Sequence, residues 1–293
     1  MCRMLVGVRD LEKPLGFRII KTCSILISLG KNPSIIDSRG VFRIFKALEK
    51  CQSMLATYKG VKVQCIATAI FRSASNAAEI LSSIYDKFKL SFYVCDPGEE
   101  IMFSAYGCRD IMVHQLSFVM DMGGGSTEIG LFQKNQESLS MLKWISLPYG
   151  LFYFDGVGAT NKSIPPDSYR ALQFFLENNP QINNNKASLV ICRSGIMTIL
   201  SSYLCKKNKI PKAMVHGRVF DVHYIIQTLN SILQMTDVQI IESKLLTNTT
   251  HITSTRGTMI FTRDVLRKMP VQFVILGNGG VKEGMMSLVC GAK

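Results

Sequence analysis

The segment at residues 121–128, with the sequence DMGGGSTE, combines the residue types of an anion-binding loop. Consecutive glycines let backbone N–H groups converge on an anion, because no side chains stand in the way. Two hydroxyl groups follow the glycines and add further donors. The residues expected to bind phosphate in this way are Gly123, Gly124, Gly125, Ser126 and Thr127.

An acidic residue lies on each side of this loop. Asp121 can hold Mg²⁺, and Glu128 can orient a water molecule or complete the metal site. A purely structural alternative is a glycine turn between two strands with a polar tip. The segment is not a Walker A loop, because no Gly-Lys-Ser or Gly-Lys-Thr follows the glycines.

Two further segments carry candidate chemistry. Glu99 and Glu100 stand where a strand is followed by a helix, so one of them could activate water as a general base. The alternative is that both complement the helix N-terminus. Arg72 also lies between a predicted strand and a predicted helix, where a guanidinium could bind phosphate with two hydrogen bonds.

Strands and helices alternate along the chain, which favours an α/β fold. Apolar runs at 61–69, 116–120 and 271–276 predict buried strands, and helical spacing predicts helices at 38–58, 75–88 and 222–235. The runs at 116–120 and 129–133 flank the glycine loop and predict a hairpin. We expect two α/β domains, 1–113 and 114–293, around a central cleft.

Composition excludes several classes of protein. Of the 293 residues 47% are hydrophobic and 19% are charged, which rules out a disordered, fibrous or coiled-coil chain. No apolar run approaches the roughly 20 residues of a membrane helix. The nine cysteines are scattered and odd in number, so they predict free thiols in a cytoplasmic protein rather than a disulfide framework or a zinc site.

The net charge of +13 favours a polyanionic partner such as polyphosphate, a nucleotide, a nucleic acid or an anionic membrane face. The alternative is that a chain rich in Lys, Asn and Ile reflects AT-rich coding. Charge alone therefore does not choose a partner.

Six segments resemble, in their order along the chain, the bacterial exopolyphosphatase / guanosine pentaphosphate phosphohydrolase (Ppx/GppA) family: ATAIFRSASNAAEIL, PGEEIMFSAYG, FVMDMGGGSTEIGLF, SLPYG, VHGRVFDVHYI and GGVKEGMMS. The resemblance covers nearly the whole chain. It implies two ribonuclease-H-like domains of the actin/Hsp70/sugar-kinase superfold around a cleft. It also implies a hydrolase that uses Mg²⁺ and water to remove the terminal phosphate of inorganic polyphosphate or the 5′ phosphate of guanosine pentaphosphate.

Roles carry over by motif. Glu100 resembles the family's catalytic base, and Glu128 resembles the acid that helps to hold the nucleophilic water or the metal. Asp121 resembles the metal-associated aspartate, Arg72 pairs with phosphate oxygens, and the loop 123–127 binds phosphate. The implied partners include no specific nucleic acid and no membrane, and a homodimer stays open.

The chain departs from the family's pattern in three places. Its first residues resemble the segment that comes after the family's first strand and Asp-x-Gly-(Ser/Thr)-Asn loop, and that loop forms the second wall of the phosphate clamp. Arg193-Ser194-Gly195-Ile196 replaces a Gly-Gly-Thr turn, and Thr250-His251-Ile252 replaces Arg-Ala-Asp. The alternative function is therefore a weakly active or inactive member that binds a phosphorylated ligand without turnover.

These motifs lead to two expectations. Without the first strand, residues 4–8 have an unpaired edge, and a form extended upstream is more active and more stable. Gly124→Val weakens binding of a short polyphosphate, because its side chain fills the volume that phosphate oxygens need.

Overall fold

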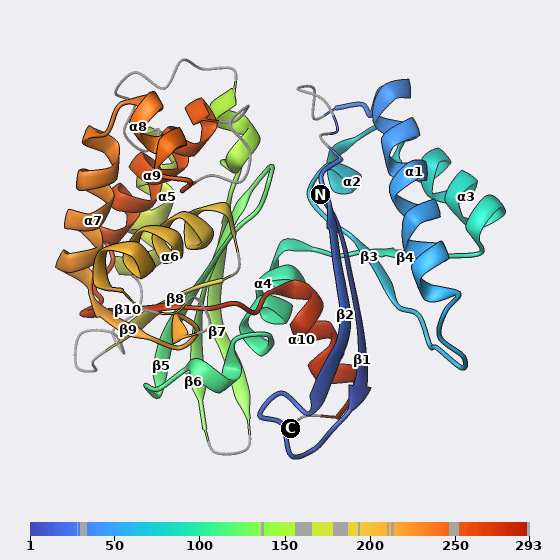
Figure 1. Ribbon diagram of the computed structural model, residues 1–293, viewed down its shortest axis with the longest axis horizontal. Helices are drawn as coiled ribbons and strands as arrows, with labels where there is room; N and C mark the ends of the chain where they lie inside the picture. The colour runs from blue at the N-terminus through green and yellow to red at the C-terminus, as the bar shows by residue number, and fades with distance from the viewer. Residues whose placement is uncertain are drawn as a thin grey trace.

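Helices and strands form a mixed α/β structure in the computed structural model (Figure 1). The part of the chain that the structure describes consists of residues 1–27, 29, 34–135, 138–155, 166–177, 187–192, 194–209, 211, 214–245 and 252–291. Within these residues no helix is both long and apolar enough to cross a membrane.

The described residues of the first third form two small sheets rather than one. Its elements are β1 (Cys2–Arg9), β2 (Phe17–Ile25), α1 (Ser38–Leu55), β3 (Cys65–Ala67), α2 (Ile70–Ser73), α3 (Ala77–Phe88), β4 (Phe92–Val94) and α4 (Pro97–Tyr106). Strands β1 and β2 form an antiparallel hairpin, whereas β3 and β4 form a separate parallel pair. Figure 1 shows the long β1–β2 hairpin and the short β3–β4 pair as distinct bodies.

The predicted unpaired edge is present. In the described residues β1 has one neighbouring strand, β2, so its other edge carries no strand, and β3 likewise pairs with β4 alone. Helices α1 and α3 pack on each other around a separate small core that includes Ile36, Ile44 and Ile84.

The rest of the chain builds one six-stranded sheet. Its elements are β5 (Leu116–Met122), β6 (Thr127–Lys134), β7 (Leu139–Leu147), α5 (Pro166–Glu177), β8 (Ser188–Ile191), α6 (Gly195–Asn208), β9 (Val219–Asp221), α7 (Val222–Gln234), α8 (Asp237–Glu242), α9 (Ile252–Leu266), β10 (Phe273–Leu276) and α10 (Val281–Val289). The strand order is β7-β6-β5-β8-β10-β9. The central pairs β5–β8 and β8–β10 are parallel, and the outer pairs are antiparallel.

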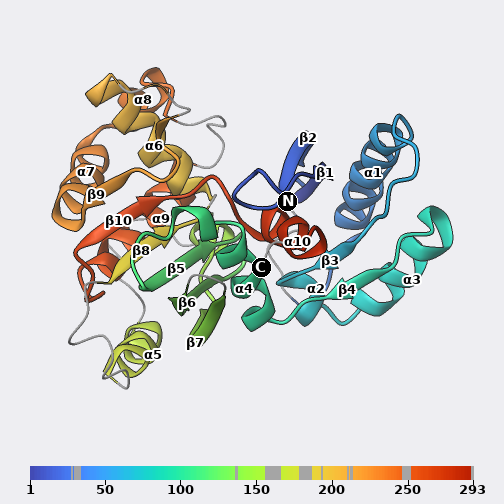
Figure 2. The ribbon, with the colours of Figure 1, turned by 90° about the horizontal axis from the view of Figure 1, so that it is seen from below.

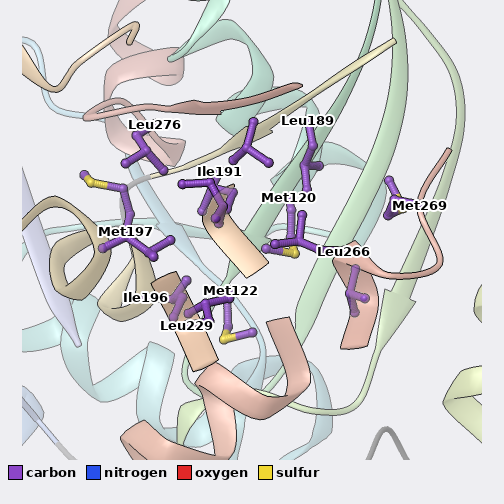
Figure 3. Close-up of a cluster of buried hydrophobic side chains, with 14 of the residues drawn as sticks. Met120, Met122, Leu189, Ile191, Ile196, Met197, Leu229, Leu266, Met269 and Leu276 are labelled. Carbon is purple, nitrogen blue, oxygen red and sulfur yellow. The ribbon is translucent and has the colours of Figure 1, made fainter. Parts of the chain in front are cut away.

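Both faces of this sheet are buried. Successive residues of a strand point to opposite sides, and each set of side chains lies in its own core. Phe118 and Leu189 face α5, α6, α7 and α9, in the large core that Figure 3 shows in part. Their neighbours Val119 and Val190 face α4 in a second core. Helix α4, which belongs to the first third of the sequence, therefore covers one face of the sheet built by the last two thirds (Figure 2).

Helix α10 and the glycines before it pack against α4 with close backbone contact. A Cβ atom at Gly279 would overlap the carbonyl oxygen of Gly107, and one at Gly284 would overlap that of Phe103. Helix α10 also packs on β1, where Met286 lies against Gly7. The GGVKEGMMS segment thus packs against α4 and β1, a role that the sequence pattern did not indicate.

Gly284→Ala is expected to destabilise the protein by about 1–3 kcal/mol, because the added methyl group meets backbone that has little room to move. Chemical denaturation measures the loss. Gly195→Ala is the matched control, since a Cβ there meets nothing within 4 Å. Equal stability of the two variants would contradict the close contact.

One predicted element differs from the structure, and one helix was not predicted. The strand expected at 61–69 is limited to β3, and Val61 and Val63 are exposed, because the segment before β3 has no partner strand in the described residues. Helix α9 was not predicted, because its buried positions include Ser254, Thr258 and Thr262 and give no apolar stripe. The predicted boundary between residues 113 and 114 stays a prediction.

Candidate active site

Asp121 and Glu128 are brought together by the predicted hairpin. Strands β5 and β6 are antiparallel, and their register places Asp121 directly opposite Glu128, with Met122 opposite Thr127 at the turn. Directly opposed residues of an antiparallel pair point to the same face. The two carboxylates therefore lie side by side at the base of the glycine loop, and both are buried.

Glu100 reaches the site from the first turn of α4. Asp96 caps this helix by accepting from the N–H of Glu99 at 2.9 Å, and Glu99 closes the capping box by accepting from the N–H of Asp96 at 3.1 Å. The two interpretations of the acidic pair, helix capping and a general base, thus apply to different residues. Glu99 serves the helix end, and Glu100 is buried and faces the hairpin carboxylates.

Arg72, on the short helix α2, joins these acids. Its Nη1 donates to Glu100 Oε2 at 2.8 Å and to the Cys95 carbonyl at 2.8 Å, and its Nη2 lies 3.8 Å from Glu128 Oε1. Just before α2, Ala69 has φ 37°, a backbone region that alanine rarely occupies. Such strain often occurs at functional sites. The structure thus brings Arg72 to the acids as predicted, but its guanidinium is already paired with Glu100.

Burial makes the three carboxyl groups hard to ionise. It raises the pKa of Glu128 to about 8, helped by the negative charges of Glu100 and Asp121, while hydrogen bonds from Ser126 and Ser146 act in the opposite direction. Burial also raises the pKa of Glu100, although Arg72 opposes this effect, and raises the pKa of Asp121. Carboxyl groups in such surroundings gain most from a bound cation.

The glycine loop presents backbone donors. The N–H groups of Gly124, Gly125 and Ser126 donate no hydrogen bond within the described residues, whereas that of Gly123 closes the turn by donating to the Ser126 carbonyl at 2.9 Å. Thr127 differs from the expectation, because its hydroxyl is buried and donates to the Tyr149 carbonyl at 2.6 Å. Free amides at a tight turn form an anion-binding concavity.

The interpretation of Gly124 needs correction. A Cβ at Gly124 would lie 2.6 Å from the ring of Phe152, so the volume beside it holds a side chain rather than space for phosphate. Gly124→Val would therefore disturb packing before it tested binding. Gly125 is the better probe, since the nearest atom to a Cβ there is Ala69 Cβ at 3.6 Å, an ordinary contact.

Two serines support the acids and were not predicted. Ser104 donates from Oγ to Asp121 Oδ2, and Ser146 donates to Glu128 Oε1 at 3.0 Å. Ser104 stands four residues after Glu100, on the same face of α4, so helical spacing carried a signal. Ser146 lies opposite Glu128 in the β6–β7 register, which the sequence alone does not give.

The oxygen donors fit a divalent cation of the Mg²⁺ type. Glu128 Oε2 is buried and has no hydrogen-bond partner among the described residues, and Asp121 offers a second carboxylate beside it. No group of three or more His, Cys, Asp or Glu side chains in the described part is arranged to hold a metal. Mg²⁺ sites in proteins often use one or two carboxylates and complete the shell with water and phosphate oxygens.

Two of the three departures from the family pattern lie partly outside the described residues. The residues outside are Arg193, in the segment 193–196, and Thr250 and His251, in the segment 250–252. The described residues nearby are ordinary helix starts. Ser194 caps α6 by accepting from the N–H of Met197 at 3.3 Å, and Ile252 opens α9.

Similarity to known proteins identifies the family of the chain. The profile of the Ppx/GppA phosphatase family matches residues 18–289. A comparison with curated protein sequences gives no significant match. The crystal structure of an exopolyphosphatase from Cytophaga hutchinsonii is similar with a TM-score of 0.79 at 16% identity, over 99% of this chain and 95% of that one.

A second solved structure, of the PPX-GPPA enzyme of Aquifex aeolicus, is similar with a TM-score of 0.72 at 18% identity, over 98% of this chain and 95% of that one. At these identities the structures establish the fold, which is that of the actin/Hsp70/sugar-kinase superfold. The profile covers all but the first 17 and last four residues of the 293. The chain thus belongs to the Ppx/GppA phosphatase family, whose members are phosphohydrolases.

Proposed function

We propose that the protein releases terminal phosphate from inorganic polyphosphate or the 5′ phosphate from guanosine pentaphosphate by attack of water. The observation that carries the proposal is the group of buried acids Glu100, Asp121 and Glu128, which lies beside Arg72 and beside backbone amides that donate no hydrogen bond within the described residues. Phosphoryl transfer needs this combination of a base, cation ligands and anion donors, because its catalysis is mostly positioning and charge neutralisation.

Each residue has a distinct task in this proposal. Glu100 accepts a proton from the attacking water, and its raised pKa brings it nearer to the working pH than an exposed glutamate. Arg72 exchanges part of its pairing with Glu100 for a phosphate oxygen, which frees the base as substrate arrives. The amides of Gly124, Gly125 and Ser126 hold the terminal phosphoryl oxygens.

Asp121 and Glu128 would hold Mg²⁺, with Ser104 and Ser146 fixing the two carboxylates. A bound Mg²⁺ supplies positive charge that neutralises the phosphate oxygens and lowers the pKa of nearby carboxyl groups. Glu128 must lose its proton to act as a ligand, so binding releases a proton and strengthens as pH rises towards about 8.

The second candidate function is binding of a phosphorylated ligand without turnover. The observation that favours it is that the described residues of the first third form two sheets that share no strand. A clamp that closes on phosphate from two sides loses precision when one side lacks a continuous scaffold.

Two parallel measurements separate the two candidate functions. The purified chain is incubated with Mg²⁺ and either polyphosphate or guanosine pentaphosphate, and inorganic phosphate is measured. In parallel, isothermal titration measures binding of a short polyphosphate. Phosphate release that needs Mg²⁺ supports the hydrolase, and binding without release supports the second candidate. If the chain neither bound polyphosphate nor released phosphate, both candidate functions would be contradicted.

Gly125→Ala is expected to weaken Mg²⁺-dependent binding of a short polyphosphate by at least about tenfold, because a methyl group would displace phosphate from the amides. Thermal unfolding should change little, since the methyl group has room. Gly124→Ala is the comparison, and it should lower stability through its contact with Phe152. Unchanged affinity in Gly125→Ala would place the phosphate site elsewhere.

A further inference from the structure

Two pairs of thiols lie almost in contact in this structure, and neither belongs to the proposed active site. Cys2 on β1 and Cys51 on α1 have their Sγ atoms 3.9 Å apart. Cys108 and Cys192 have theirs 3.8 Å apart. All nine cysteines are present as free thiols.

The two pairs differ in access to solvent. Cys108 and Cys192 are each 0% exposed, between α4 and the end of β8, within the second core of the large sheet. Cys2 is partly exposed, and Cys51 beneath it is 7% exposed. A small oxidant can therefore reach the first pair while the second stays covered.

The pairs also differ in electronic state. The hydrogen bond from the Cys51 thiol lowers the pKa of Cys2, against the effect of burial. The same hydrogen bond raises the pKa of Cys51. Burial raises the pKa of Cys65 to about 11, and the hydrogen bond with Cys108 together with burial raises that of Cys192. Cys2 therefore has the most thiolate character of these cysteines.

We infer that Cys2 and Cys51 form a peroxide-sensitive pair in which Cys2 is oxidised first and Cys51 completes a reversible disulfide between β1 and α1. Cys2 attacks the peroxide O–O bond and becomes a sulfenic acid, and the peroxide leaves as water or an alcohol. The Cys51 sulfur then attacks the Cys2 sulfur and releases water. Two thiols lose two electrons and two protons in total, and the peroxide is reduced.

The geometry suits this step. The two sulfur atoms need to close from 3.9 Å to the roughly 2 Å of a disulfide, which is within the range of side-chain rotation. The bond would tie the β1–β2 hairpin, whose outer edge has no strand partner in the described residues, to the longest helix of the first third. Nearby Cys23 and Cys65 are the competing partners for Cys2.

Peptide mapping tests the inference on the full chain. The folded protein is treated with hydrogen peroxide, blocked with N-ethylmaleimide and digested with trypsin. We expect peptide 1–3 joined to peptide 51–59, with the link removed by dithiothreitol. In Cys51→Ser treated with the same peroxide, dimedone should label Cys2 at least about tenfold faster than Cys108, because Cys108 is 0% exposed.

Cys108→Ser is the matched control, and it should leave the yield of the linked peptide unchanged. Cys2→Ser should abolish oxidation at Cys51. The wild-type digest decides the matter even where a variant folds poorly. Absence of the 1–3/51–59 link, or a link from Cys2 to Cys23 or Cys65 in its place, would overturn the inference.

Discussion

Glu100→Gln is expected to lower the rate of phosphate release by about 10²–10⁴-fold, the usual contribution of a general base. Glutamine keeps the shape of the side chain, and its amide oxygen can still accept from Arg72, so the local structure should persist. It cannot accept a proton from water. The measurement is kcat for polyphosphate at saturating Mg²⁺, with thermal unfolding as a check on folding.

Glu99→Gln is the matched control for this variant. Glu99 is the neighbouring residue, but its carboxylate serves the capping box and accepts from the Tyr93 hydroxyl at 2.6 Å. Glutamine is acceptable in a capping box. Its activity should stay near that of the parent. If Glu100→Gln retained activity within a factor of three of the parent, another residue would have to be the base.

The second large effect concerns Glu128 and pH. Its pKa in the folded chain, about 8, is raised above that of an unfolded glutamate. The resulting contribution to stability is fully present below the unfolded pKa and is lost as pH rises through about 8. The protein without a bound cation should therefore lose stability between roughly pH 4.5 and 8.5, by about 3–5 kcal/mol at most.

Glu128→Gln removes this loss, because a neutral amide resembles the protonated acid. At pH 8.5 and without divalent cations the variant should be more stable than the parent by about 3–5 kcal/mol, and at pH 4 the two should be alike. Denaturation at several pH values measures the difference. Parallel pH profiles of parent and variant would show that Glu128 ionises normally.

Mg²⁺ provides a second test of the same residue. At pH 8.5 a cation bound by the ionised Glu128 should raise the stability of the parent by mass action and should have little effect on Glu128→Gln. Glu99→Gln again serves as control and should respond as the parent does. An equal response in all three proteins would place the cation elsewhere.

The site could be predicted largely because its parts are local in sequence. The hairpin β5–β6 places Asp121 beside Glu128 through a turn of four residues, and the helix start at Asp96 presents Glu100. These arrangements follow from strand alternation and from helix capping. Arg72 was a candidate from its place between a strand and a helix, and the resemblance to the family strengthened it, but its approach to Glu100 spans 28 positions in the sequence.

The features that could not be predicted depend on contacts between distant segments. The ring of Phe152 beside Gly124 and the glycines of α10 against α4 arise from tertiary packing, which leaves no periodic pattern. Helix α9 escaped prediction because its buried positions mix small hydroxyl residues with apolar ones and form no apolar stripe. The separation of β1–β2 from β3–β4 is a property of strand pairing, and strand pairing is not visible in either strand's own letters.

The late position of α10 in the chain has a consequence for biosynthesis. Helix α4 is made early, yet the glycines that cover its carbonyl groups belong to residues 279–284. Strand β10 similarly separates β8 from β9, so the far edge of the large sheet cannot pair until residue 276 has been made. A nascent chain therefore exposes an incomplete sheet and an uncovered helix until residues 273–284 have been made, and apolar surface exposed during that interval favours aggregation.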